Sequence, residues 1–433
     1  MRQLFVKNKT KSDDKGIIHN KNFLLLFGGR LISQFGESVY SFSIVWYLLD
    51  QSIGATIHTG AIMTLSIIPS VIFGPAFGAI LDRCNRKGAL IISDLVRGIL
   101  LIILGVMIGF SERTLELLYI GTVLLGTFSA LYNPAYNSII PNIVAPDYIQ
   151  KVVSINSITA NVTRILGLLT AGLLYSWLGI AGVFYINAVS YLLSGISQLF
   201  IRIPRKNNQT IFTFGYKSIK SNVIKISHEI GEGYTYLKNS SGLYILFWFL
   251  FILNIFSIPL IQICIPYIYN RILGATSFDL ALTEVVFAVG YIIGALIAAM
   301  LPKVEKLYKR IGFSYSIASI LVAFLLVPIL LANNLCLTYK LAIYILLSFL
   351  CGFFMAMGDI PINVIFQNKV IDSIRGRVYS LLNTFTNMAM PIGYILLSFL
   401  SDKIPMIVIL ASVSLFLLTC SQIMIASKHI QTL

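Results

Sequence analysis

The chain has 433 residues, of which 57% are hydrophobic and only 11% are charged, and its formal net charge is +15. A soluble protein carries about a quarter charged residues, so this composition excludes an ordinary soluble enzyme. Uninterrupted apolar runs of membrane-spanning length recur along the sequence, which predicts an all-α integral membrane protein rather than a barrel of alternating strands. The net positive charge does not indicate nucleic-acid binding, because Lys and Arg lie mostly between the apolar runs.

The order of polar and apolar segments predicts the domain organisation. Residues 1–22 are polar and contain no signal-peptide core, so we expect a cytoplasmic tail. Twelve apolar runs follow, and we expect them to form two pseudo-symmetric six-helix bundles, 23–201 and 243–426, joined by a cytoplasmic linker at 202–242 and followed by a tail at 427–433. The predicted helices cover 23–49, 59–81, 89–110, 115–136, 151–177, 180–201, 243–268, 279–301, 312–331, 338–361, 376–400 and 404–426.

The distribution of basic residues predicts the orientation of these helices. Twenty-five Lys and Arg residues lie in the two tails and in the loops on the same side, against four on the opposite side. Basic residues accumulate on the cytoplasmic side of membrane proteins, so we expect both termini in the cytoplasm of a multi-pass cell-membrane protein. Lys and Arg residues near the membrane surface would also contact anionic lipids.

The linker contains an amphipathic segment. Its apolar residues recur at spacings of three and four, which predicts one helix lying along the cytoplasmic face. They are Ile219, Val223, Ile226, Ile230, Tyr234 and Leu237. Packing on its own bundles is the favoured interpretation, and a partner-binding helix is the alternative.

Charge is concentrated in the segment "GAILDRCNRKGALIISDLVRG", residues 78–98. Its first part sits between the second and third predicted helices. We expect Gly78 to allow a neighbouring helix to approach closely, and Asp82 to be stabilised by the N–H groups of a facing helix or by Arg86. Arg83, Arg86 and Lys87 are suited to hold the loop against the other bundle and against lipid.

This loop resembles the signature of the major facilitator superfamily, roughly G-x-L-x-D-R-x-G-R-K-x-x-L, although Asn85 stands where the pattern often has Gly. The segments "NPAYNSIIPNIV" (133–144) and "RGRV" (375–378) resemble its macrolide-efflux and siderophore-exporter branch. The resemblance covers the whole chain. It implies a twelve-helix transporter that exports amphipathic molecules, macrolide-like drugs above all, by proton antiport. It also implies that the loop is a conformational latch for the outward-facing state.

Asp94 and Arg97 follow inside the third predicted helix. Asp94 lies about 9 Å from the helix start at 1.5 Å per residue, where an unpaired carboxylate is costly. The two side chains are three residues apart and can pair, and Asp94 can alternatively face Arg83 or Arg86. We interpret both as structural members of the latch rather than substrate contacts.

Ionisable residues in the first and fifth predicted helices are the candidates for coupling. Arg30 and Glu37 are two turns apart on one face of the first helix, with Gln34 nearby. A carboxylate inside a transporter can exchange a proton as access alternates, or pair with a cationic substrate. The alternative is a structural Glu37 neutralised by a basic residue. Arg164 is a counter-ion for Glu37 or a site for an anionic substrate group.

Other polar residues in or next to the predicted spans are candidates for lining the cavity. They are Tyr40, Asn254, Gln262, Glu284, Asp359, Asn363 and Asn387. For the Asn and Gln residues an interhelical hydrogen bond is an equal alternative. Glu284, at the outer end of its predicted helix, and Asp359, near the cytoplasmic end of its own, are the weaker candidates, and an interfacial charge is the favoured interpretation of both.

The remaining function classes are less well supported. The histidines lie outside the predicted spans and the cysteines are scattered, so we expect no metal site, no cofactor and no enzymatic activity. No G-x-x-x-x-G-K-[ST] motif appears, which excludes ATP-driven pumping by this chain alone. We expect a monomer that binds a small molecule, protons and lipids. Export of a siderophore or lipid-like metabolite is the closest alternative, and a channel or permease subunit is the alternative from another class.

Overall fold

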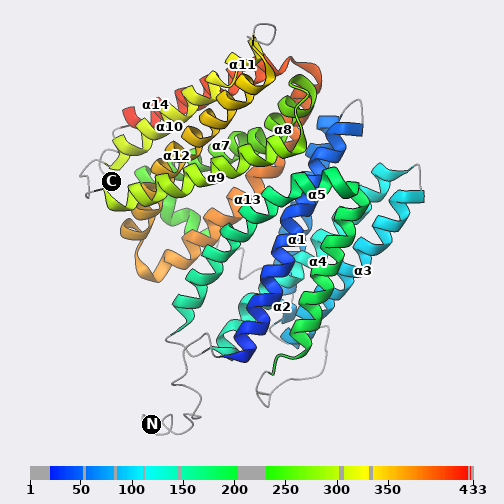
Figure 1. The fold of residues 1–433 in the computed structure, drawn as a ribbon. Coiled ribbons are helices and arrows are strands. Elements are labelled where there is room, and N and C mark those ends of the chain that lie inside the picture. Colours follow the sequence, from blue (N-terminus) through cyan, green and yellow to red (C-terminus); the bar gives the residue numbers. More distant parts are fainter. Residues whose placement is uncertain are drawn as a thin grey trace, which may run out of the picture. The chain divides into compact units, whose positions relative to one another are not determined.

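The computed structural model describes residues 20–51, 55–81, 85–110, 113–144, 148–202, 231–301, 307–330, 335–427 and 430 (Figure 1). Helices make up nearly all of these residues, and no strand occurs among them. The all-α prediction is therefore confirmed. This follows from the bilayer, in which a backbone must satisfy its hydrogen bonds within the spanning segment.

Five long helices form the first part of the chain. They are α1 (Lys21–Gln51), α2 (Ala55–Leu81), α3 (Arg86–Phe110), α4 (Thr114–Ile143) and α5 (Ile149–Leu199). The 51-residue α5 is broken at Gly179, whose φ of 64° and ψ of −172° are readily adopted only by glycine. It therefore consists of two arms, in agreement with the two separate helices expected at 151–177 and 180–201.

The second part of the chain begins with a composite helix. It consists of α7 (Ser241–Pro259), the π-helical segment η3 (Leu260–Cys264), α8 (Ile265–Tyr267) and a second π-helical segment η4 (Ile268–Ile272). The remaining helices are α9 (Ser277–Met300), α10 (Leu307–Phe324), α11 (Val327–Leu330), α12 (Leu337–Lys369), α13 (Asp372–Lys403) and α14 (Met406–Ala426). The π-helical turns were not expected from the apolar pattern.

Ten candidate membrane spans occur among the described residues. One of them, Ile158–Leu199, is 42 residues long and contains the break at Gly179, so it includes two membrane-length arms. The 31-residue α1 is also long enough to cross a bilayer, although it is more polar and is not one of the ten. Counting α1 and both arms of α5 agrees with the twelve helices expected.

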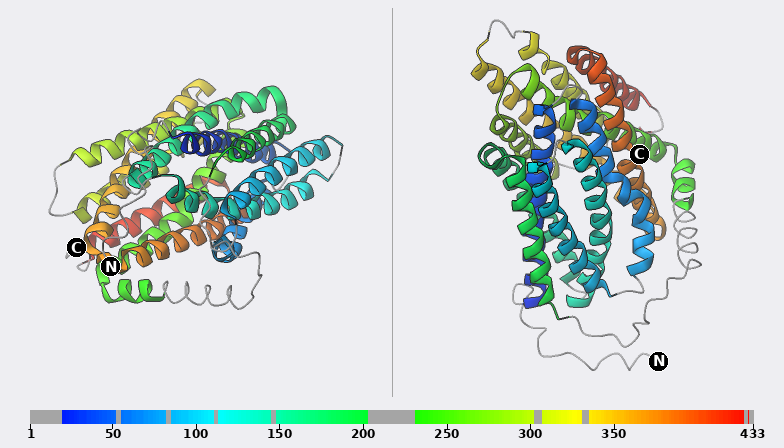
Figure 2. Two further views of the ribbon diagram at one scale, coloured as in Figure 1. Left: turned by 90° about the horizontal axis from the view of Figure 1, so that it is seen from below. Right: turned by 90° about the vertical axis from the view of Figure 1, so that its right-hand side faces the viewer.

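The chain divides into two compact units that do not follow its two halves. Unit 1 consists of Met1–Tyr40, Ile72–Gly167 and Ala181–Asn222. Unit 2 consists of Ser41–Val71, Leu168–Ile180 and Val223–Leu433. Several long helices of each unit can be followed in the further views of Figure 2.

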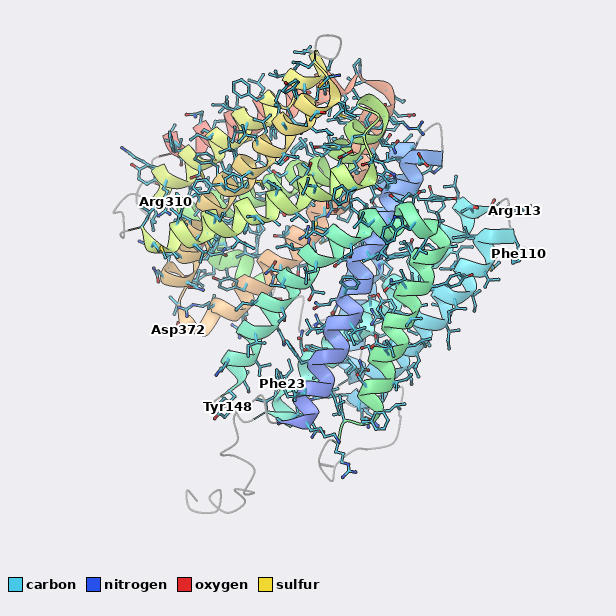
Figure 3. All side chains as sticks on the ribbon, in the orientation of Figure 1. Phe23, Phe110, Arg113, Tyr148, Arg310 and Asp372 are labelled. Carbon is cyan, nitrogen blue, oxygen red and sulfur yellow. The ribbon has the colours of Figure 1, made fainter. Side chains whose placement is uncertain are left out.

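Unit 1 has an apolar core at one end. Its buried residues include Phe23 of α1, Leu90 of α3 and Tyr136 of α4, and Tyr148 packs against them. Figure 3 shows Phe23 and Tyr148 at this end of the unit, and Phe110 and Arg113 at the other end. The core therefore packs the ends of α1, α3 and α4 together, next to the residues that line the charged cavity described below.

Unit 2 contains segments from both halves of the sequence because small residues let them pack tightly. A Cβ atom added to Gly60 of α2 would lie 2.3 Å from the Ser398 hydroxyl of α13. A Cβ atom added to Gly172 of α5 would lie 2.8 Å from the carbonyl oxygen of Ser277, whose hydroxyl donates to the Gly172 carbonyl at 3.0 Å. Such close backbone approach is typical of membrane helix interfaces.

The end of the predicted linker packs on unit 2. Residues 231–239 are helical, and Leu237 of the apolar stripe is buried. Glu232 pairs with Arg377 at 2.5 Å, and the Tyr236 hydroxyl donates to the Lys369 carbonyl at 3.2 Å. A second stripe residue, Tyr234, has its hydroxyl 3.1 Å from the Tyr244 hydroxyl. The remaining stripe residues lie outside the described residues: Ile219, Val223, Ile226 and Ile230. The described end of the linker thus contacts its own chain.

Cys336, at the start of α12, offers a test of the expected orientation. Its thiol is exposed, and a backbone hydrogen bond at Tyr339 holds its pKa below the usual value. A larger thiolate fraction at neutral pH makes a cysteine more reactive. We expect a membrane-impermeant maleimide to label Cys336 in intact cells, because the charge distribution places this loop outside.

The matched control is Cys336→Ser, which should remove the label. Labelling that appears only after the membrane is permeabilised would show the inverted orientation.

Candidate functional site

A polar cavity of about 250 Å³ lies within unit 1. Three helices of the unit line it: α1, α3 and α4. The lining residues are Arg30, Ser33, Gln34, Glu37, Arg97, Ser129, Tyr132 and Asn133. Three charged side chains thus share one cavity: Arg30 and Glu37 from the first predicted helix and Arg97 from the third.

Helical periodicity brings the α1 residues to the cavity. Positions 33, 34 and 37 follow Arg30 by three, four and seven residues, so the four side chains lie on one face. Glu37 is exposed, which leaves its carboxylate accessible to a ligand or to water. Neighbouring Gly36 faces away from water and packs on Asn187 and Ser190, where a Cβ atom would lie within 2.6 Å of the Asn187 side chain. Close packing of α1 on α5 therefore fixes the direction of Glu37.

Arg97 belongs both to the cavity and to a buried polar network. It forms an ion pair with Asp94, and these side chains are only 2% and 0% exposed. The other Asp94 oxygen accepts hydrogen bonds from the Ser194 hydroxyl at 2.7 Å and the Gln198 amide at 2.6 Å. Asp94 is therefore fully satisfied, as a buried carboxylate requires. The pairing of Asp94 with Arg97 that the spacing suggested is present.

Aromatic rings hold both arginines of the cavity. The Arg97 guanidinium lies over the rings of Tyr191 at 4.1 Å and Tyr132 at 4.5 Å, and it donates to the Ser129 hydroxyl at 3.2 Å. The Arg30 guanidinium lies over the Tyr136 ring at 4.1 Å. Cation–π contact stabilises a cation while leaving its N–H edge available for hydrogen bonds. The cavity can therefore bind a polar or anionic group beside the Glu37 carboxylate.

The α4 residues of this site were not singled out from the sequence. Ser129, Tyr132 and Asn133 line the cavity, and Tyr136 lies one turn further along and donates to the Asn156 side chain at 3.1 Å. In the sequence these four residues recur at helical spacing and therefore form a polar stripe on one face of α4. It could have been recognised only together with the arginines that face it.

Two first-half candidates do not line this cavity. Tyr40 packs on the ring of Phe184 at 5.1 Å and is not among the lining residues of this cavity. Arg164 is exposed on the first arm of α5 and is not among them either.

The candidates of the second half are distributed over several helices of unit 2. The Asn254 amide donates to the Leu250 carbonyl of its own helix at 2.8 Å, and the Gln262 side chain accepts from the Tyr394 hydroxyl. Glu284 is partly buried on α9 and Asn387 is exposed on α13. Asp359 is hydrogen-bonded to tyrosines on α9 and α10.

Only part of the expected latch can be described. Asp82 and Arg83 lie outside the described residues. Arg86 donates to the Ser138 carbonyl at 3.0 Å and Lys87 to the Leu199 carbonyl at 2.8 Å, both within unit 1. These basic residues thus bind carbonyl groups of their own unit, including one at the end of α5, where a cation is favoured.

The close helix approach expected at Gly78 is not observed. A Cβ atom added there would have no other atom of the described residues within 4 Å.

A protein of membrane-length helices with a charged cavity inside one helical unit belongs to the class of polytopic membrane transporters. Residues 26–394 match the Major Facilitator Superfamily, and the chain belongs to this family. Its relatives are transporters and not enzymes.

Characterised relatives cover most of the chain. Macrolide efflux protein A of Streptococcus pyogenes is 25% identical over 88% of this chain and 90% of its own length. The staphyloferrin A transporter of Staphylococcus aureus is 24% identical over 87% of each chain.

Solved structures share the fold at low sequence identity. A bacterial homologue of the iron transporter ferroportin, solved in an inward-facing state, matches with a TM-score of 0.68 and 13% identity over 94% of this chain and 99% of that chain. The nucleoside transporter NupG matches with a TM-score of 0.65 and 14% identity over 94% and 97%.

Proposed function

We propose that the protein is a secondary active exporter of amphipathic small molecules, most specifically macrolide-like drugs, and that it works by alternating access coupled to protons. We further propose that it acts as a monomer in the cell membrane with both termini in the cytoplasm. The observation that carries the proposal is the cavity in which the accessible carboxylate of Glu37 lies with Arg30 and Arg97.

The cavity chemistry supports proton coupling. A carboxylate in a transporter can bind a proton when it faces one side of the membrane and release it when it faces the other. A cationic drug can compete for the same carboxylate, which couples drug release to proton uptake. Arg97 is neutralised by Asp94, so the cavity charge is set mainly by Arg30 and Glu37.

The relatives support the substrate class. Macrolide efflux protein A aligns over 88% of the chain, and its name describes efflux of macrolides. A second candidate, siderophore export, is favoured by the staphyloferrin A transporter and by Arg30, whose guanidinium could pair with an anionic substrate.

A drug-accumulation assay tests the proposal. We expect a host that lacks its own drug exporters to accumulate less labelled macrolide when it expresses this chain, and a protonophore to restore accumulation. The control is the same host with the empty vector.

Unchanged macrolide accumulation, with the protein detected in the membrane, would contradict the macrolide assignment. A siderophore that appears in the medium only when the chain is expressed would instead support the second candidate.

A further inference from the structure

Three titratable side chains from three helices meet in unit 2. One carboxylate oxygen of Asp359 on α12 accepts a hydrogen bond from the Tyr291 hydroxyl of α9 at 2.9 Å. The other oxygen accepts from the Tyr315 hydroxyl of α10. Tyr315 is 4% exposed, whereas Asp359 and Tyr291 are partly buried. We refer to Asp359, Tyr291 and Tyr315 as the Asp359 cluster.

Close helix packing brings the cluster together. The sequence GYIIG places Gly290 and Gly294 on one face of α9, where added Cβ atoms would lie 2.2 and 2.3 Å from carbonyl oxygens of α12. A Cβ atom at Gly352 of α12 would likewise lie 2.2 Å from a carbonyl oxygen of α9. Such small-residue motifs allow membrane helices to approach closely. Gly358, directly before Asp359, leaves room for the Tyr315 ring in the same way.

The cluster lies within three candidate membrane spans of the structure, Ser277–Met300, Leu307–Leu330 and Leu337–Lys369. At 1.5 Å per residue, Asp359 is about 15 Å from the end of α12 at Lys369, Tyr291 about 13 Å from the end of α9, and Tyr315 about 12 Å from the start of α10. The charge distribution assigns all three helix ends to the same side of the membrane. The three side chains therefore lie about two turns or more inside the ends of these membrane-length helices.

The charged groups around the cluster do not neutralise Asp359. Arg310 on α10 points its guanidinium to the Met357 sulfur at 3.7 Å, and Asp359 forms no ion pair with another of the described residues. The other charged or titratable groups of α9 and α10 lie at least six residues along each helix from Tyr291 or Tyr315, and they are Asp279, Glu284, Tyr308 and Lys309. On α12 itself, Tyr339, Lys340, Tyr344, Cys351 and Lys369 are at least eight residues from Asp359. α11 carries no titratable residue, and α7 contributes the Phe249 ring, which packs edge-on against Tyr315.

Asp359 therefore differs from Asp94, the other deeply placed aspartate. Asp94 is paired with Arg97, whereas the partners of Asp359 are two neutral hydroxyl groups. A carboxylate inside a membrane-spanning segment without a cation is costly, and binding a proton removes that charge.

We propose that the Asp359 cluster is a proton-binding site of the transporter, built from other helices than the cavity of Glu37. As an anion, Asp359 accepts from both tyrosines. After it binds one proton, the acid donates to one tyrosine oxygen and still accepts from the other hydroxyl. The same three side chains thus hold both states, and the net change is the addition of one proton. The role of this proton in transport rests on the proposed function, but its binding does not depend on the substrate.

Infrared difference spectroscopy of the purified full chain in lipid tests the proposal. We expect acidification to produce a carbonyl band of a protonated carboxylic acid that is lost in Asp359→Asn. Tyr315→Phe and Tyr291→Phe should keep the band but change its frequency, because each removes a hydrogen bond to the acid. The matched control is Asp402→Asn at the end of α13, where Asp402 is exposed, and this variant should keep the band unchanged.

A band of unchanged size and frequency in Asp359→Asn would overturn the proposal. So would tyrosine variants that fold and show the same frequency as the unmodified chain, and these variants keep the test decisive if Asp359→Asn does not fold. A failure of macrolide efflux would leave these spectra unaffected, so the two proposals fail separately.

Discussion

Asp94→Ala is expected to destabilise the protein by about 3–5 kcal/mol, because it leaves the Arg97 guanidinium buried without its carboxylate. The side chain of Arg97 is 2% exposed, so water cannot replace the lost partner. Ser194 and Gln198 would lose their acceptor as well. The measurement is the free energy of unfolding in detergent micelles, compared with that of the unmodified chain.

A double variant tests whether the unpaired Arg97 causes this loss of stability. Replacing a buried ion pair by apolar residues of similar volume is often neutral or even stabilising, so Asp94→Leu with Arg97→Met should recover most of the stability lost in Asp94→Ala. The exposed pair of Arg113 and Glu116 is the matched control, because it has the same spacing but side chains that are 79% and 66% exposed. Its removal should change stability by about 0–1 kcal/mol. If the double variant is no more stable than Asp94→Ala, the unpaired charge of Arg97 does not explain the lower free energy of unfolding.

Much of the fold follows from the sequence because the bilayer restricts the choice. Apolar runs of membrane length must be helical, and this constraint also separates the two arms of α5 at Gly179. The π-helical segments η3 and η4 could not be predicted in this way. The composite helix also makes close contacts, for example at Gly393, where an added Cβ atom would lie 1.9 Å from the Ile255 carbonyl oxygen of α7. Hydropathy carries no information on such contacts.

The candidate site was predictable within one helix and less so between helices. Arg30, Gln34 and Glu37 share a face of α1 by periodicity, and the structure places all three on the cavity. Arg97 was interpreted as a support of the latch, and the structure shows that it also lines this cavity. The position of Arg97 along its helix does not predict that it lines the cavity, because a long side chain can reach a cavity while it is held in a buried ion pair. Tyr132 shows the same limit, since its place between two arginines depends on three helices.

The hypothesis that Glu37 carries the coupled proton leads to the largest expected effect on transport. Glu37→Gln keeps the size and polarity of the side chain but removes its ability to exchange a proton. We therefore expect efflux that is driven by a proton gradient to fall to the level of the host without the protein. The measurement is drug uptake into inverted vesicles with an imposed pH gradient, with the amount of protein in the membrane determined in parallel.

Glu116→Gln is the control, because it makes the same chemical change on an exposed residue of α4 outside the cavity. This variant should transport as the unmodified chain does. Exchange of labelled for unlabelled drug without a gradient adds a second measurement. If Glu37 carries the proton and does not bind the drug, Glu37→Gln should retain exchange while losing gradient-driven uptake. If a cationic drug pairs with the carboxylate, both activities should be lost together. Full gradient-driven uptake by Glu37→Gln would exclude Glu37 from coupling and leave the Asp359 cluster as the proton site to be tested by the same assay.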